Sequence, residues 1–124
     1  MLTRDQILAA SDLKTEIVDV PEWGGQVTVR TMTGAEKDEW EERLLAGSEE
    51  GSRKVTLKRI RATLLALTVV DESGKRLFAD SDVERIAGKS AAAIDRVYEA
   101  ASRLNRLSKQ DVEELEKNSG SAPT

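Results

Sequence analysis

The apolar positions near the start of the chain alternate in two runs, and this alternation predicts two strands. The first run occupies residues 14–20. The second occupies residues 26–32, where Val27 and Val29 share one face. The sequence PEWGG lies between the two runs, and proline followed by a Gly–Gly pair is typical of a chain reversal. We therefore expect a β-hairpin whose turn contains Trp23.

Two capping-box spacings predict the first two helix starts. Thr3 precedes Gln6 by three residues, and Thr33 precedes Glu36 in the same way. The first pair begins a helix of one or two turns before the hairpin. The second begins a longer helix that follows the hairpin and can end at Gly47.

The most apolar part of the chain is the run at residues 55–70. Its first half keeps a helical spacing of apolar residues and its second half is apolar nearly all round, as in a central, buried helix. Acidic residues dominate 34–50 and basic residues dominate 53–61. We expect these two helices to pack antiparallel with complementary charge, and Trp40 and Leu44 to face the core.

Three further helices are predicted in the second half of the chain. Asp80 or Ser81 can cap a short helix that stops near Gly88. Ser90 starts a long amphipathic helix, and Ser108 caps a final short one.

Length and composition fit a single domain. The chain has 124 residues, of which 39% are hydrophobic and 34% are charged, against about 25% charged in an average domain. We expect an α+β fold, mainly helical, with an N-terminal β-hairpin packed on a bundle of about four to five helices. The domain covers residues 1–117, and the small, polar segment at 118–124 is expected to be disordered.

The chain contains neither cysteine nor histidine. This excludes disulfides, thiolate nucleophiles, the usual zinc sites and every acid–base scheme that uses histidine. Paired carboxylates such as Glu41–Glu42 lie on helix faces without apolar neighbours that would raise a pKa. We therefore expect no catalytic residue, no cofactor and no metal ion, so the protein is predicted not to be an enzyme.

Two short motifs fail their spacing tests. A calcium loop starting at Asp80 needs glycine at its sixth position and an acid at its twelfth, where this chain has Arg85 and Ala91. A phosphate-binding loop ending at Gly88 needs a glycine five residues earlier, where Val83 stands. Helix capping and helix termination explain both motifs better.

Charge and hydropathy limit the partners. A net charge of −4 disfavours general binding to nucleic acid, because an acidic surface repels phosphates. The basic run at 53–61 lacks aromatic residues that would stack on bases. No apolar run approaches the ~18–20 residues of a membrane span, and the N-terminus lacks a signal-peptide pattern. We expect a cytosolic protein that does not bind a membrane.

Trp23 has two interpretations that stay open at this point. Chain reversal does not require a large ring in the turn. The indole can fold back onto the hydrophobic core, or it can serve as a binding anchor, since exposed tryptophan is enriched in interface hot spots.

Three segments together resemble the tail assembly chaperones of long-tailed bacteriophages, which are also encoded by integrated prophages. The first is LTRDQILAASDLKTEIVDVPEWGGQVTVRTMTGAEKDEWE, with its VPEWGG turn and TGAE helix start. The second is ESGKRLFADSDVERIAGKSAAAIDRVYEAASRLNRLS, and the third is QDVEELEKNSG. None of them is a catalytic signature, so the resemblance depends on their combination and order.

The resemblance implies a non-enzymatic function in the cytoplasm of the infected bacterial host. Such chaperones bind and solubilise the tape measure protein, help recruit tail tube subunits around it, and are absent from the mature virion. Self-association is expected because many copies are needed to coat a long chain. The expected contact surface is Trp23 in the hairpin with Val112 and Leu115 in the last helix. The alternatives are a structural tail component (a tube or connector subunit) and, less favoured, a small nucleic-acid-binding regulatory module.

Overall fold

The computed structural model describes residues 1–46 and 59–107, with the side chains of residues 44–46 not among those described. In chain order the elements are α1 (Arg4–Ala9), β1 (Thr15–Val20), the 3₁₀ turn η1 (Pro21–Trp23), β2 (Gly25–Arg30), α2 (Gly34–Ala46), α3 (Ile60–Thr68), β3 (Val69–Val70), the 3₁₀ turn η2 (Asp80–Asp82), α4 (Val83–Ala87) and α5 (Ala91–Leu104). The fold is α+β and mainly helical, as predicted.

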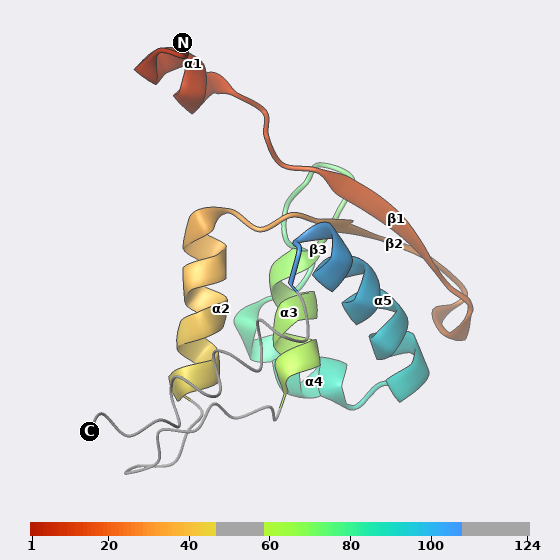
Figure 1. The fold of residues 1–124 in the computed structure, drawn as a ribbon. Helices are drawn as coiled ribbons and strands as arrows, with labels where there is room; N and C mark the ends of the chain where they lie inside the picture. Colours follow the sequence, from red (N-terminus) through yellow and green to blue (C-terminus); the bar gives the residue numbers. More distant parts are fainter. Residues whose placement is uncertain (47–58, 108–124) are drawn as a thin grey trace.

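Helix α3 lies at the centre of the molecule. It stands between α2 and α5, and the three-stranded sheet packs across α3 and α5 (Figure 1). Every residue of α3 except Arg61 is buried. Helices α2 and α3 contact each other and run in opposite directions, as the sequence predicted (Figure 1). Trp40 of α2 reaches the core with 2% of its surface exposed.

The predicted hairpin is present. Strands β1 and β2 are antiparallel, with Val18 opposite Val27 and Val20 opposite Gly25. Val20 and Val29 are fully buried, so one face of the hairpin contributes directly to the core. The alternating pattern indicated this face correctly because successive strand residues point to opposite sides of a sheet.

The predicted helix at 55–70 is too long at its C-terminal end. Helix α3 ends at Thr68, and Val69 and Val70 form strand β3, which pairs with Val29 and Thr28 of β2. A run that is apolar on all sides suits a buried strand as well as a buried helix, so periodicity does not distinguish them. The two β-branched valines fit the pleated, half-buried surface of a sheet. The sheet therefore has the order β1-β2-β3.

The capping residues match three of the predicted helix starts. At α1, Thr3 Oγ1 accepts a hydrogen bond from Gln6 N (3.2 Å), while Gln6 Oε1 accepts one from Thr3 N (2.9 Å). Thr33 and Glu36 form the same reciprocal pair before α2. Ser90 Oγ accepts a weaker bond from the third residue of α5, at 3.4 Å. These bonds satisfy backbone N–H groups that have no partner within the helix.

The predicted cap of the next helix is wrong in detail. Neither Asp80 nor Ser81 caps a helix by a side-chain bond. Instead, an Asp82 carboxylate oxygen accepts from the backbone N–H of Ala79 at 2.9 Å, and η2 precedes α4. Gly88 ends α4, as expected.

The expected ion pairing between α2 and the basic run is not observed for the described residues of that run. Arg59 pairs with Glu84 of α4 (3.0 Å), and Arg61 pairs with Asp95 of α5 (2.9 Å). Both basic residues thus connect α3 to the second half of the chain. The rest of the run, 53–58, lies outside the described residues.

Other predictions also fall on residues that the structure does not describe. These are the side chain of Leu44, the polar linker after Gly47, the helix starting at Ser108, and the tail at 118–124.

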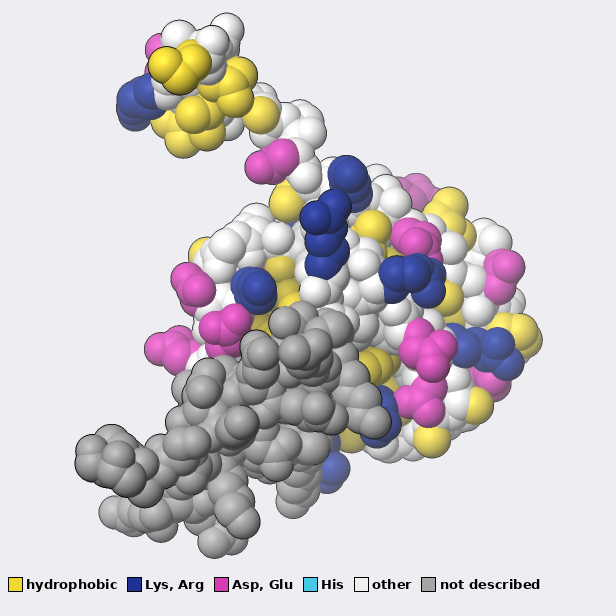
Figure 2. Space-filling model, viewed as in Figure 1, with side chains coloured by type: hydrophobic (Ala, Val, Ile, Leu, Met, Phe, Trp, Pro, Cys, Tyr) yellow, Lys and Arg dark blue, Asp and Glu magenta, His cyan; other side chains and the backbone are white. Residues whose placement is uncertain are grey.

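The N-terminal arm, residues 1–14, stands away from the rest of the molecule. Every residue in it is exposed, and α1 has no buried residue. The arm joins the body at Lys14, whose N–H donates to Thr31 Oγ1 and whose carbonyl accepts from Thr31 N, both at 2.9 Å. Hydrophobic side chains gather on the arm (Figure 2). Its most exposed apolar residues after Met1 are Leu2 (73%), Ile7 (57%) and Leu8 (68%).

Candidate partner-binding surface

Trp23 lies at the tip of the hairpin in a turn that its neighbours define. Pro21 starts the turn with a fixed φ, and its carbonyl accepts a hydrogen bond from Gly24 N at 3.0 Å. Gly24 has a φ of 75°, which glycine adopts without the penalty that a Cβ would bring. Trp23 is half-buried and packs against the core. The first interpretation of Trp23 is therefore confirmed, since the indole contacts the core, and its role as a binding anchor stays a prediction.

An ion pair fixes the hairpin tip to α5. The Nε of Arg96 donates to both carboxylate oxygens of Glu22 at 3.0 Å. Two hydrogen bonds hold the pKa of Glu22 below its ordinary value. The first comes from the backbone N–H of Glu22 itself, and the second comes from Arg96. Trp23 follows Glu22 directly, so this pair connects the turn that carries Trp23 to α5.

Phe78 approaches the same region from another part of the chain. Its segment is held by Arg76, whose Nε donates to the carbonyl of Ala66 at 2.8 Å and whose guanidinium also pairs with Asp80 at 2.6 Å. The hydrogen bond from Arg76 lowers the pKa of Asp80, and the charge of Arg43, which also pairs with it, adds to this effect. Phe78 is half-buried and packs against the core.

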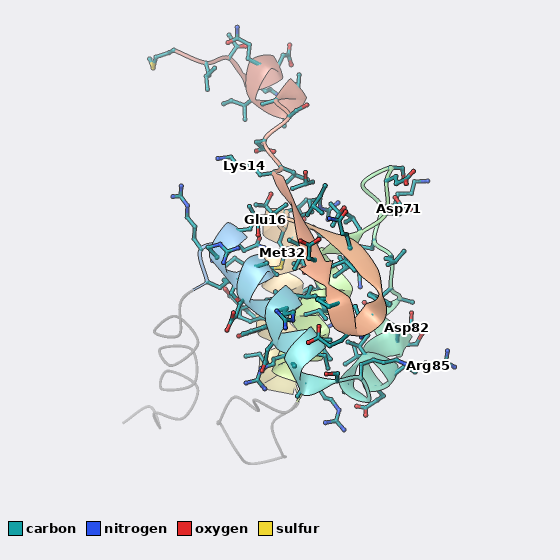
Figure 3. All side chains as sticks on the ribbon, turned by 90° about the vertical axis from the view of Figure 1, so that its right-hand side faces the viewer. Lys14, Glu16, Met32, Asp71, Asp82 and Arg85 are labelled. Atoms are coloured by element: carbon teal, nitrogen blue, oxygen red, sulfur yellow. The ribbon has the colours of Figure 1, made fainter. Side chains whose placement is uncertain are left out.

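These side chains surround an open hollow of about 490 Å³, which we call the Trp23 hollow. Its lining residues are Trp23, Phe78, Asp82, Arg85, Ile86 and Lys89. Most of its lining surface is apolar, and the charged members supply two cations and one carboxylate. Asp82 and Arg85 lie beside the hairpin tip, far from Lys14 at the other end of the hairpin (Figure 3). An apolar concavity with a few charged groups suits the apolar face of a helix.

The carboxylates near the hollow have structural partners. Asp80 pairs with arginines, and Asp82 accepts from a backbone amide. Among the residues described, no group of three or more acidic side chains is placed to hold a metal ion. Of the alternating acids at 80–84, Asp82 thus caps the turn that precedes α4, while Asp80 and Glu84 pair with arginines.

Only one of the three predicted contact residues is among those described. Trp23 lies in the hollow, whereas Val112 and Leu115 are outside the described part of the chain. The sequence did not identify Phe78 and Ile86 as neighbours of Trp23. The apolar pair Leu77–Phe78 after a polar turn was the available signal, but a sequence pattern does not show which distant residue it meets.

Comparison with known proteins decides the family. A family model described as phage tail assembly chaperone matches residues 3–118, nearly the whole chain. The chain belongs to this family. The role of a tail assembly chaperone is non-enzymatic, in agreement with the prediction from composition. Comparison with curated proteins finds no match.

The fold agrees with that of a solved phage protein. The tail assembly chaperone of bacteriophage HK97 superposes on this chain with a TM-score of 0.53 at 16% sequence identity, and the match covers 85% of this chain and 92% of that chain. At this identity the likeness concerns the fold. None of the helices in residues 1–46 and 59–107 is long and apolar enough to cross a membrane.

Proposed function

We propose that this tail assembly chaperone binds the tape measure protein of a long-tailed phage, keeps it dispersed, and helps recruit tail tube subunits around it. It acts in the cytoplasm of the bacterial host, in several self-associated copies, and does not enter the mature virion. The membership of the chain in the family supports this proposal.

The observation that carries the proposal is the half-buried indole of Trp23, which lines the Trp23 hollow together with Phe78. A long helical client exposes apolar stripes before its tube forms, and such stripes associate with one another unless they are covered. The Trp23 hollow covers a short part of a stripe by helix-in-groove packing, and Arg85 and Lys89 at its rim contact acidic residues that flank the stripe. Val112 and Leu115 are proposed as further contacts.

Co-expression with helical fragments of the tape measure protein tests the proposal. The wild-type chain is expected to keep such fragments in the supernatant after centrifugation. Trp23→Ala and Arg85→Glu each lower the recovered fragment, because the first removes the apolar anchor and the second reverses the charge at the rim. Leu77→Ala is the matched control, since Leu77 is 54% exposed but does not line the hollow.

Truncation after Ser108 tests the other proposed contacts in the same assay. It should weaken capture while the circular dichroism of the body stays unchanged. Full capture by the truncated chain would remove Val112 and Leu115 from the contact surface. Finding the chain in purified virions by mass spectrometry would instead identify a structural tail component.

A further inference from the structure

A second hollow lies at the other end of the hairpin, where the N-terminal arm joins the body. Three segments form it: the base of the arm, the connection between β2 and α2, and the end of α5. It is open to solvent and has a volume of about 520 Å³. Lys14 and Met32 line it, and they lie away from Asp82 and Arg85 of the Trp23 hollow (Figure 3). We call this second site the junction hollow.

The side chain of Asn105 connects two walls of the junction hollow. Its Oδ1 accepts a hydrogen bond from Met32 N at 2.6 Å. Its Nδ2 donates to the carbonyl of Ala101 at 2.9 Å and to that of Arg30 at 3.4 Å. The end of α5 is therefore attached to the connection between β2 and α2, and the hollow is formed before any segment enters it.

The lining of the junction hollow combines apolar surface with positive charge. Leu13 is 41% exposed, and Met32 and Leu104 are half-buried. The charged members are three exposed cations and one carboxylate, namely Lys14, Lys37, Arg106 and Asp12. Lys and Arg side chains gather on the body beneath the arm (Figure 2). A surface of this kind suits an acidic segment that carries a few apolar side chains.

The chain turns beside the junction hollow as it leaves α5. Arg106 has a φ of 57°, and its N–H donates to the carbonyl of Arg103 at 3.1 Å. Leu107 N donates to the carbonyl of Ser102 at 2.7 Å. These two bonds form a Schellman motif, which ends a helix and turns the chain. Leu107 then packs into the core, so the described chain ends next to the hollow that Arg106 lines.

The sequence that follows has the matching chemistry. Residues 111–116 read DVEELE, which is four acids and two apolar residues. Val112 and Leu115 are three positions apart, so they share one face of the helix that the sequence predicts there. Only residues 107–111 separate Arg106 from Val112. At up to about 3.3–3.6 Å per residue, this connection is long enough to cross the hollow.

We propose that residues 111–116 dock into the junction hollow of their own chain. Val112 and Leu115 cover the apolar lining, and the four acids face the three cations. The short connection favours the segment of the same chain over that of a second copy, because it gives an effective concentration of about millimolar. The inference does not depend on tape measure binding. A client that uses Val112 and Leu115 must first displace the segment.

Disulfide trapping in the full-length chain tests the docking, because the protein has no cysteine of its own. Leu115→Cys with Leu13→Cys places one thiol in the segment and one in the hollow. Leu115→Cys with Arg85→Cys is the matched control, since Arg85 is exposed but lies at the opposite end of the hairpin. In oxidised glutathione the first pair should close an intramolecular disulfide at least about tenfold faster than the second.

Charge variants of the first cysteine pair separate docking from simple proximity. Lys37→Glu should slow disulfide formation about threefold to tenfold, as expected for reversing one solvent-exposed charge contact. Lys75→Glu makes the same change of charge at an exposed lysine outside the hollow, and it should leave the rate unchanged. Both lysines are on the surface, so both variants are expected to fold, which circular dichroism checks. Raising the salt concentration should slow the reaction in the same direction as Lys37→Glu.

Three results would overturn the inference. Equal rates for the two cysteine pairs, or a rate that Lys37→Glu does not change, would mean that the hollow does not hold the segment. Disulfide-linked dimers in place of cross-linked monomers, on a non-reducing gel, would mean that the segment docks on a second copy.

The capture assay examines the client separately. The trapped chain should keep fewer tape measure fragments in the supernatant than the same chain after reduction. Equal capture by both forms would remove Val112 and Leu115 from the proposed client surface, whereas the rates of disulfide formation alone decide the docking.

Discussion

Helices α1 and α3 place similar apolar residues in opposite surroundings. In α3, Leu64, Leu65 and Leu67 are fully buried, whereas in α1 Ile7 and Leu8 are mostly exposed. A buried leucine contributes about 1.5–3 kcal/mol relative to an exposed one, so α3 stabilises the fold and α1 does not. The apolar residues of α1 remain available for binding. Stability and association therefore depend on different parts of the chain.

Replacing one leucine in each helix gives the largest expected difference. Leu65→Ala should lower the free energy of unfolding by about 2–5 kcal/mol, because it leaves a cavity in the packed core. Leu8→Ala should change it by less than about 0.5 kcal/mol. Urea denaturation of each variant measures both changes in the free energy of unfolding. The transition is monitored by tryptophan fluorescence at a concentration where the chain is monomeric. A cost for Leu8→Ala comparable to that of Leu65→Ala would show that the arm packs on the body.

The body and the N-terminal arm also differ in their ion pairs, and the expected effect on the free energy of unfolding is smaller than for the leucines. Arg30 in the body contacts both carboxylate oxygens of Glu36 at 2.6 and 2.7 Å, and donates to the carbonyl of Gly74 at 3.0 Å. The two side chains of the pair are 15% and 16% exposed. Arg30→Ala leaves a partly buried carboxylate without its partner and should cost about 2–3 kcal/mol, somewhat below the range for fully buried pairs. Arg4→Ala in the arm should have no measurable effect on the same urea transition, because the pair it forms is fully solvated.

A substantial part of the fold was predictable because its signals are local. The capping boxes at Thr3 and Thr33 involve side chains three residues apart, and Pro21 and Gly24 define the hairpin turn. Val69 was predicted to be helical because a run of apolar residues has no periodicity that distinguishes a buried helix from a buried strand. Only the pairing of Val69 with β2 shows that this residue belongs to a strand.

The candidate site was less predictable because it is built from distant segments. Trp23 was identified from its place in a turn, but Phe78 meets the same hollow from a segment more than fifty residues later in the sequence. The partner of Arg59 was predicted in α2 and proved to be Glu84 in α4, since charge alone does not choose between acidic neighbours. The capping-box spacing of Thr3 and Gln6 predicted α1, but it did not predict that this helix lacks contact with the body.

The smallest expected effect appears in acid. The hydrogen bond from Arg76 lowers the pKa of Asp80 from its ordinary value of 3.8. A carboxyl whose pKa is lower in the folded state contributes stability above 3.8, and this contribution disappears as pH falls through the folded pKa. Asp80→Asn should thus be slightly less stable than the wild type at pH 7. The difference is small because the side chain is 47% exposed and its ion pairs are screened by solvent.

Thermal unfolding of both proteins from pH 7 down to pH 2 measures this difference. The difference in stability between the wild type and Asp80→Asn should become smaller below pH 3.8 and vanish in strong acid. A difference that stays constant over the whole range would mean that Asp80 contributes through packing and not through its charge.

The position of β1 in the sheet has a consequence for solubility. Within the described part of the chain, β1 has one hydrogen-bonded neighbour, β2, so its other side is an open strand edge. Such an edge can seed the stacking of strands into fibrils, above all when it is long, flat and apolar. Glu16 and Asp19 place negative charges along this strand, and Pro21 follows its last residue. A crowded solution of these molecules is therefore protected against fibril growth along β1, because like charges oppose each additional strand and Pro21 prevents the edge from lengthening.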